Sequence, residues 1–273
     1  MSSDSFSSWL ALREPADRAA RSTALTQAIA AALPPDRPLR ILDLGSGTGS
    51  NVRYLSPQLP VPQQWLVVDR DPELLAEVSG QSADCQIDTL CRNLGVLDDP
   101  ALFDGRHLVT SSALLDLVSE EWLRALAARC RAGRTAALFT LNYNGRSQCL
   151  PVEAEDDAIR DLMNRHQRTN DKGFGRAAGP DAVDCAAASF AAAGYQVRRE
   201  ASDWVLHPEQ RELQRQLIEG WAHAGEEIAP EQASMIHNWL ARRLAHVEEG
   251  RSRVVVGHDD VAAWLSWSDV STI

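Results

Sequence analysis

The sequence predicts an α/β protein with a doubly wound, mostly parallel seven-stranded sheet and helices on both faces. Three observations indicate this fold. Short apolar runs alternate with helical patterns along the first half of the chain, which is typical of parallel strands joined by crossover helices. The first apolar run ends in a glycine-rich turn that opens a helix. Further helical segments precede and interrupt this alternation, so we also expect an N-terminal helical cap and inserted helices.

The N-terminal elements lead into the glycine turn. Residues 7–33 have helical periodicity, with Pro15 as a candidate break. A proline-rich stretch, 34–38, ends this helical region and links it to a predicted strand at 39–44. The second predicted strand, 65–68, ends at Asp69. Asp71 and Pro72 then suit the cap and first residue of a helix.

The later elements continue the pattern with interruptions. Strands are expected near 87–92, at 108–110 and at 136–141, with a helix from Ser119 to Arg131 whose charges agree with the helix dipole. The segments expected after strand five are a helix at 153–168, a glycine-bearing loop at 170–175, a helix at 181–193, a strand around Tyr195 and Val197, a helical pair at about 208–249, and a strand at 253–256.

Composition and charge limit the classes of function. The 273 residues, 44% of them hydrophobic, can fill one sizeable core. A net charge of −11 argues against nucleic acid or an anionic membrane as a partner. The N-terminus has no signal-peptide pattern, and five scattered cysteines suit neither disulfides nor a metal site. We therefore expect a cytoplasmic protein without a metal; a homodimer is also compatible with the sequence.

The turn after the first strand reads Asp43-Leu44-Gly45-Ser46-Gly47-Thr48-Gly49. Its glycines allow backbone angles that a side chain would block and let a ligand lie on the backbone. A dinucleotide fold has the spacing G-x-G-x-x-G, whereas Ser50 stands here at the third glycine position. The carboxylate of Asp43 also suits a ligand with ammonium and sulfonium charges better than a pyrophosphate.

This segment resembles the first motif of class I S-adenosylmethionine-dependent methyltransferases, whose loop cradles the methionine part of the cofactor. In that family an acidic residue ending the second strand binds the ribose hydroxyls, and Asp69 matches it. The adenine-reading residue is either Asn93 or Asp88. The resemblance, which covers roughly residues 39–141, implies S-adenosylmethionine as cofactor and these cofactor-binding residues: Asp43, Gly45, Ser46, Gly47, Gly49, Asn51, Asp69, Arg70, Asn93, Leu94 and Ser111.

The resemblance further implies one methyltransferase domain over residues 1–273. We expect this domain to consist of a helical cap at 1–38, a cofactor-binding half at 39–142, an inserted substrate-side helix and loop at 143–180, and a C-terminal half at 181–273. The D/N-P-P-Y/F motif of amino-methylating DNA enzymes and the Pro-Cys pair of cytosine-C5 enzymes are both missing. We therefore expect methyl transfer to an oxygen or nitrogen of a small-molecule acceptor, which could carry a carboxylate or phosphate.

The acceptor site is expected at the carboxyl ends of the strands. Its candidate residues are Trp9, Arg13, Asn142, Arg168, Lys172 and Phe174. Tyr143 and His166 are the candidate catalytic residues, although His166 also fits the buried face of its helix. The cations around the predicted loop could equally be a solvated helix end. Two other functions stay open: a nicotinamide-dependent oxidoreductase and a non-catalytic cofactor-binding protein.

Overall fold

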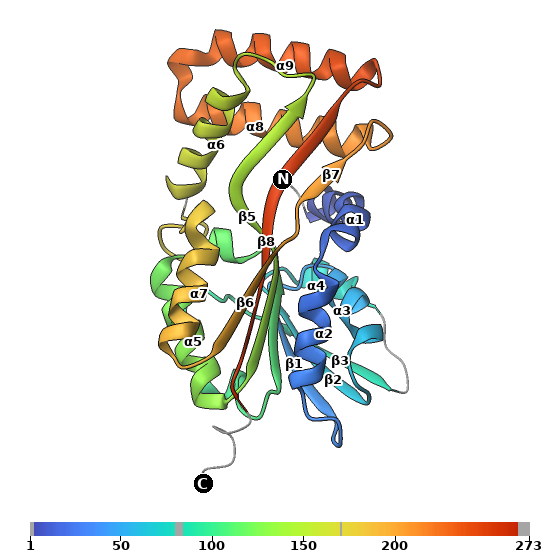
Figure 1. The fold of residues 1–273 in the computed structure, drawn as a ribbon, viewed down its shortest axis with the longest axis vertical. Helices are drawn as coiled ribbons and strands as arrows, with labels where there is room; N and C mark the ends of the chain where they lie inside the picture. The colour runs from blue at the N-terminus through green and yellow to red at the C-terminus, as the bar shows by residue number, and fades with distance from the viewer. Residues whose placement is uncertain (1–2, 80–83, 170, 267–273) are drawn as a thin grey trace.

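The computed structural model describes residues 3–79, 84–169 and 171–266, which contain an eight-stranded sheet (Figure 1). Its order is β3-β2-β1-β4-β5-β8-β6, and β7 also pairs with β8. The strands are β1 (Leu39–Leu44), β2 (Gln63–Asp69), β3 (Cys85–Cys91), β4 (Leu108–Ser112), β5 (Ala136–Leu150), β6 (Gln196–Ala201), β7 (Trp204–Leu206) and β8 (Arg253–Trp264). The first five strands are parallel and β8 is antiparallel to its neighbours. The predicted fold class is confirmed, with β7 as an additional strand.

Helices cover both faces of this sheet (Figure 1). Helices α5 (Glu120–Gly133) and α7 (Ala182–Ala192) pack on one face, and α2 (Thr23–Ala32), α3 (Ser50–Leu55) and α4 (Pro72–Ala76) lie on the other. Each face buries its own apolar core, which is the arrangement expected for a doubly wound sheet. Among the described residues, no helix is both long and apolar enough to cross a membrane.

The N-terminal helical region breaks at a different place from the predicted one. Helix α1 (Ser3–Ala20) runs through Pro15, and α2 begins at Thr23. The break lies at Ser22, whose hydroxyl oxygen accepts a hydrogen bond from the backbone N–H of Leu25 at 3.2 Å. An N-cap hydroxyl therefore decides the boundary, while α1 accommodates the proline within its length.

Strands β5 and β8 are much longer than the sequence pattern indicated. Residues 143–150, expected in an inserted helix and loop, continue β5 and pair with β8 as far as Leu150 opposite Arg253. The register shifts near Leu141, which has a positive φ of 57°. These irregularities interrupt the polar–apolar alternation from which strands are recognised, because a bulge changes the face to which side chains point.

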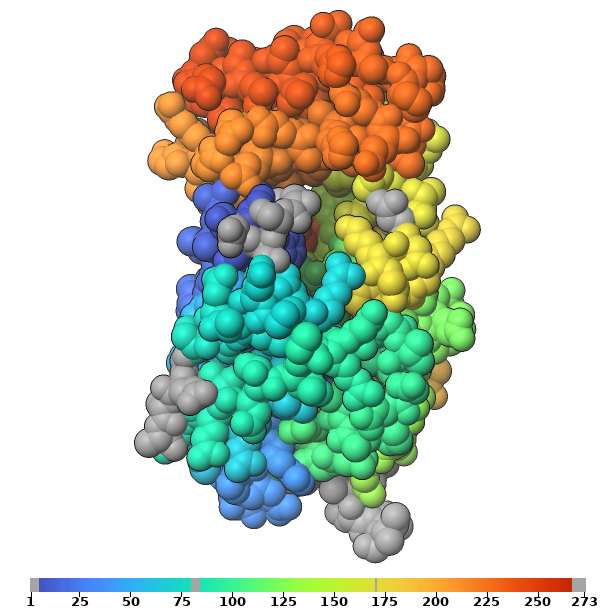
Figure 2. Space-filling view, turned by 180° about the vertical axis from the view of Figure 1, so that it is seen from behind, coloured from blue at the N-terminus to red at the C-terminus, as the bar shows by residue number. Residues whose placement is uncertain are grey.

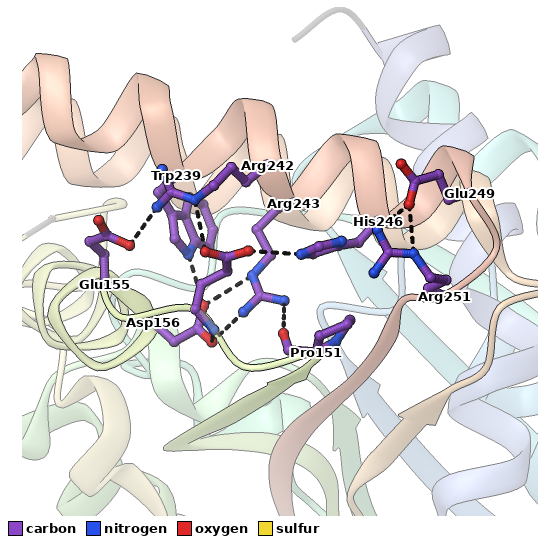
Figure 3. Close-up of polar contacts among 10 residues, drawn as sticks. Pro151, Glu155, Asp156, Trp239, Arg242, Arg243, His246, Glu249 and Arg251 are labelled. Carbon is purple, nitrogen blue, oxygen red and sulfur yellow. Dashed lines mark hydrogen bonds and ion pairs between the residues drawn. The ribbon is translucent and has the colours of Figure 1, made fainter.

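The extended β5–β8 ribbon carries a second layer above the sheet. This cap consists of β7 with α6 (Asp156–Thr169), α8 (Arg211–Ile228) and α9 (Ala233–Glu248) (Figure 1). The pair α8 and α9 confirms the helical pair predicted at about 208–249. Arg243, which is fully buried, joins α9 to α6 by donating to the Asp156 carboxylate and to the Pro151 carbonyl (Figure 3).

Candidate functional site

A cavity of about 440 Å³ lies between the sheet and the cap. In the space-filling view it opens as a hollow between α1, α8 and the segment that follows α6 (Figure 2). Its floor includes the loops after β1 and β4, where the strand order reverses direction. This switch point is where open α/β sheets bind ligands, and the glycine loop that was predicted to hold a ligand lies there.

The glycine loop forms one end of the cavity. Gly45, Gly47 and Gly49 have positive φ angles of 65°, 52° and 82°, and the first two line the wall. A Cβ on Gly47 would lie 3.0 Å from Leu10 Cδ1. The loop is therefore built from conformations that side chains rarely adopt, and its bare backbone is available to a ligand.

Asp69, at the end of β2, is fixed against this loop. One carboxylate oxygen accepts a hydrogen bond from the Gly47 N–H at 2.9 Å, and the other accepts from the Asp71 N–H at 3.1 Å. Asp71 itself caps α4 by accepting from the Glu73 N–H, as predicted. Asp69 and its neighbour Arg70 both line the cavity.

Beneath the loop lies a buried polar network. Asp43 is fully buried and outside the cavity wall; its Oδ1 accepts from Asn51 Nδ2 at 2.7 Å, while its Oδ2 has no hydrogen-bond partner. Burial raises the pKa of Asp43 to about 7. Arg21, also buried, donates to Asn51 Oδ1 at 2.6 Å. The network fixes Asn51, which does line the cavity, and leaves one carboxyl oxygen of Asp43 below the loop without a partner.

The residues proposed for the adenine side do not all lie in one place. Leu94 lines the main cavity, whereas Asn93 lies at a second, shallower one and accepts from the Gly95 N–H at 2.8 Å. Asp88 lines neither cavity. Ser111 is buried behind the wall, and its neighbour Ser112 takes the lining position. The alternation along β4 accounts for this difference, since adjacent residues point to opposite faces of a strand.

The acceptor candidates are also only partly brought together. Trp9, Arg13, Lys172, Phe174 and Tyr143 line the cavity. The candidates that lie elsewhere are Asn142, which accepts from the Leu115 N–H, Arg168, which pairs with Asp181, and His166, whose Nε2 lies 2.7 Å from Glu227 Oε2. Asn170, part of the predicted loop, lies outside the described residues.

Tyr143 contributes a ring rather than a free hydroxyl. Its phenol donates to Asn164 Oδ1 at 2.9 Å, and Asn164 in turn donates to the Gly145 carbonyl. Burial raises the pKa of Tyr143 above its ordinary value. A phenol with this environment is protonated at neutral pH, so its chemistry is that of a hydrogen-bond donor.

Several wall residues were not among the predicted site residues. They are Asp116, Met163, Trp204, Leu217, Trp221, Val256 and His258, and they come from the turn after β4, from β8 and from the cap. The Trp204 indole donates to Asp17 Oδ1 at 3.0 Å, and the guanidinium of Arg13 lies 4.8 Å from the Trp204 ring. One signal was available in the sequence: His258 follows an apolar run at the end of a strand. The positions of the other wall residues depend on contacts between segments that are distant in the sequence.

Buried His258 predicts a pH dependence of stability. Burial, with a smaller effect from Arg13, lowers the pKa of the folded imidazole to about 3, while an unfolded histidine titrates near pH 6.5. Below pH 6.5 the unfolded state therefore binds a proton that the folded state does not, and stability falls. Between pH 6.5 and 5.5 this group should cost about 1 kcal/mol. His258→Phe should show a shallower loss in urea denaturation; parallel pH slopes for the two proteins would contradict this assignment.

Comparison with known proteins finds distant structural similarity only. No protein-family model matches the chain, and no curated protein does. The chain is similar to the cyclopropane synthase MmaA2 of Mycobacterium tuberculosis, with 12% identity, a TM-score of 0.46, and 87% and 82% of the two chains covered. The YcgJ protein of Bacillus subtilis is 13% identical, with a TM-score of 0.48, and the match covers 90% of this chain and 100% of YcgJ. Phosphoethanolamine N-methyltransferase 2 of Haemonchus contortus, solved with S-adenosylmethionine, is 13% identical, with a TM-score of 0.47. That match covers 97% of this chain and 58% of the other. Such distant likeness carries neither a substrate nor a mechanism over to this chain.

Proposed function

We propose that this protein is an S-adenosylmethionine-dependent methyltransferase that acts on an oxygen or nitrogen of a small molecule. The observation that carries the proposal is one cavity with two different ends. A positive-φ glycine loop and Asp69 form the first end, and aromatic side chains from α1 and the cap form the second. The first end suits an adenosyl cofactor and the second an organic acceptor.

The chain's own groups fit this cofactor. Gly45 and Gly47 line the cavity and carry no side chain. The Asp69 carboxylate would accept hydrogen bonds from the ribose hydroxyls. Asp43, with its unpartnered buried oxygen, favours a cationic ligand over a pyrophosphate. S-adenosylmethionine supplies a methyl group that its sulfonium already activates, so the protein's task is to align the acceptor and to exclude water.

A nicotinamide-dependent oxidoreductase is supported less well by the same geometry. Dinucleotide folds place the pyrophosphate at a helix N-terminus and have the strand order 3-2-1-4-5-6. Here the helix after the loop, α3, has six residues, and the antiparallel β8 stands between β5 and β6. Calorimetry with S-adenosylhomocysteine and with NADH separates the two proposals, and binding of NADH alone would overturn ours.

Methyl transfer itself needs a second measurement. The protein should transfer label from methyl-labelled S-adenosylmethionine to a component of a fractionated small-molecule extract. A protein that binds S-adenosylhomocysteine but labels nothing would instead be a non-catalytic cofactor-binding protein. The labelled product would also identify whether the accepting atom is oxygen or nitrogen.

Removal of the Asp69 carboxylate should weaken cofactor binding. Asp69→Ala is expected to lower the affinity for S-adenosylhomocysteine by about 1–3 kcal/mol, because the ribose hydroxyls would lose charged acceptors. Asp104→Ala is the matched control, since this aspartate is exposed and lies outside the cavity. Calorimetry measures both variants. Equal affinities in the Asp69→Ala protein and in the control would refute the assigned role.

A further inference from the structure

Asp116 is a buried carboxylate that the predicted site does not include. It lies in the short 3₁₀ helix Leu115–Leu117 that follows β4, and it lines the cavity. Only 7% of the residue is exposed, and its Oδ1 has no hydrogen-bond partner. Burial raises its pKa to about 6. An acceptor oxygen without a partner in a buried site costs free energy unless a ligand supplies the missing donor.

The other carboxylates of the described wall are already engaged. Asp17 accepts from Arg13 and from the Trp204 indole. Asp69 accepts from two backbone N–H groups through its two oxygens. Asp116 therefore differs from both, because its buried Oδ1 accepts no hydrogen bond from the described residues.

The wall beside Asp116 is aromatic. The backbone N–H of Tyr143 stabilises the Asp116 carboxylate, which places this residue next to it. The Tyr143 ring lies 6.3 Å from the His258 ring, and His258 lies 5.1 Å from the Trp204 ring, measured between centroids. Trp9 and Trp221 also line the cavity. Aromatic ring faces attract cations, and this attraction is stronger when the cation has lost its hydration shell.

No cationic side chain in the described wall forms an ion pair with Asp116. Arg13 is bound to Asp17, and Arg92 pairs with Asp99. Arg70 donates to the Lys172 carbonyl, and Lys172 is exposed. The Lys172 ammonium and the Arg13 guanidinium interact with the Asp116 carboxylate only by longer-range electrostatic attraction. His258 is neutral because burial lowers its pKa to about 3, so it adds no competing positive charge.

We infer that the aromatic end of the cavity binds the methyl acceptor as an amine, and that Asp116 pairs with its ammonium group. For transfer to that nitrogen, the Asp116 carboxylate takes one proton from the ammonium, and the free amine then has the lone pair that receives the methyl group. This inference rests on the proposed function and makes its acceptor more specific. An uncharged hydroxyl compound would leave Asp116 without a cation and would gain nothing from the aromatic faces beyond contact.

The test compares two probes of nearly the same shape, 2-phenylethylamine and 2-phenylethanol. Their affinities are measured by calorimetry and by tryptophan fluorescence, with and without S-adenosylhomocysteine. The wild-type protein should bind the amine about 10- to 100-fold more tightly than the alcohol. Asp116→Asn should bind both probes equally and should keep its affinity for S-adenosylhomocysteine. Asp161→Asn, on the exposed side of α6, is the matched control and should keep the amine preference.

Each outcome bears on one proposal. Equal binding of the two probes by the wild-type protein, or an amine preference that survives in Asp116→Asn, would overturn the inference. The wild-type comparison needs no variant, so a folding defect of Asp116→Asn cannot obscure it; Asp116→Glu should retain the preference. Failure to bind S-adenosylhomocysteine would instead count against the proposed function, while the titrations without that compound still test the amine site.

Discussion

Replacement of Gly47 by valine should lower the affinity for S-adenosylhomocysteine by about 2–4 kcal/mol, because it adds both strain and bulk to the loop. Gly47 has φ 52° and lines the cavity, and its Cβ would contact Leu10 at 3.0 Å. A β-branched residue is a genuine outlier at such a φ. Either the loop keeps its shape and pushes against Leu10, which also lines the cavity, or the loop relaxes and loses its backbone conformation. Calorimetry on the folded variant measures the loss.

A substitution at Gly194 is the control for the effect of backbone strain alone. This glycine has φ 86°, and a Cβ on it would meet nothing within 4 Å. Gly194→Val should therefore lose stability through strain, measured by thermal unfolding, and should bind S-adenosylhomocysteine as tightly as the wild type. If Gly47→Val also binds at the wild-type level, the loop does not contact the ligand and the proposed cofactor site is wrong.

The contrast between these two glycines explains what could be predicted from the sequence. The glycine loop and Asp69 are local features: each follows a strand, and parallel strands end at the same edge of the sheet. Their place in the cavity therefore follows from short stretches of sequence. Gly194 has the same backbone freedom but ends helix α7 in open space, so the conformation of a glycine predicts a site only together with its topology.

The acceptor end could not be predicted in the same way. Trp204 and Asp17 are 187 positions apart, and both depend on how α1 meets the β5–β8 ribbon. That ribbon contains bulges which the alternation of side chains does not reveal. Asn142 follows the expected end of β5, but its side chain bonds to the Leu115 N–H and the Asp259 carbonyl instead of lining the cavity. Its carboxamide is used to join strands, which residue type alone cannot indicate.

A buried cation, Arg243, joins helices α6 and α9 of the cap that supplies the aromatic end. Arg243→Met should lower the free energy of unfolding by about 3–5 kcal/mol, because it leaves the Asp156 carboxylate without its charge partner. Arg243 is fully buried and donates to both Asp156 oxygens and to the Pro151 carbonyl (Figure 3). The Trp239 indole and the Glu153 backbone N–H still donate to Asp156, at 2.8 and 2.9 Å, but two neutral donors do not replace a guanidinium. Urea denaturation measures the loss.

A variant at a neighbouring arginine distinguishes the effect of losing a buried contact from the effect of losing a charge. Arg251 pairs with Glu249 at the end of α9, and its side chain is 51% exposed (Figure 3). Arg251→Met removes the same charge from a pair that water screens, so it should cost less than about 1 kcal/mol. Similar losses in the two variants would show that net charge rather than the buried contact is responsible. Because Arg243 lies outside the cavity wall, its folded variant should bind S-adenosylhomocysteine normally while unfolding at lower urea concentration.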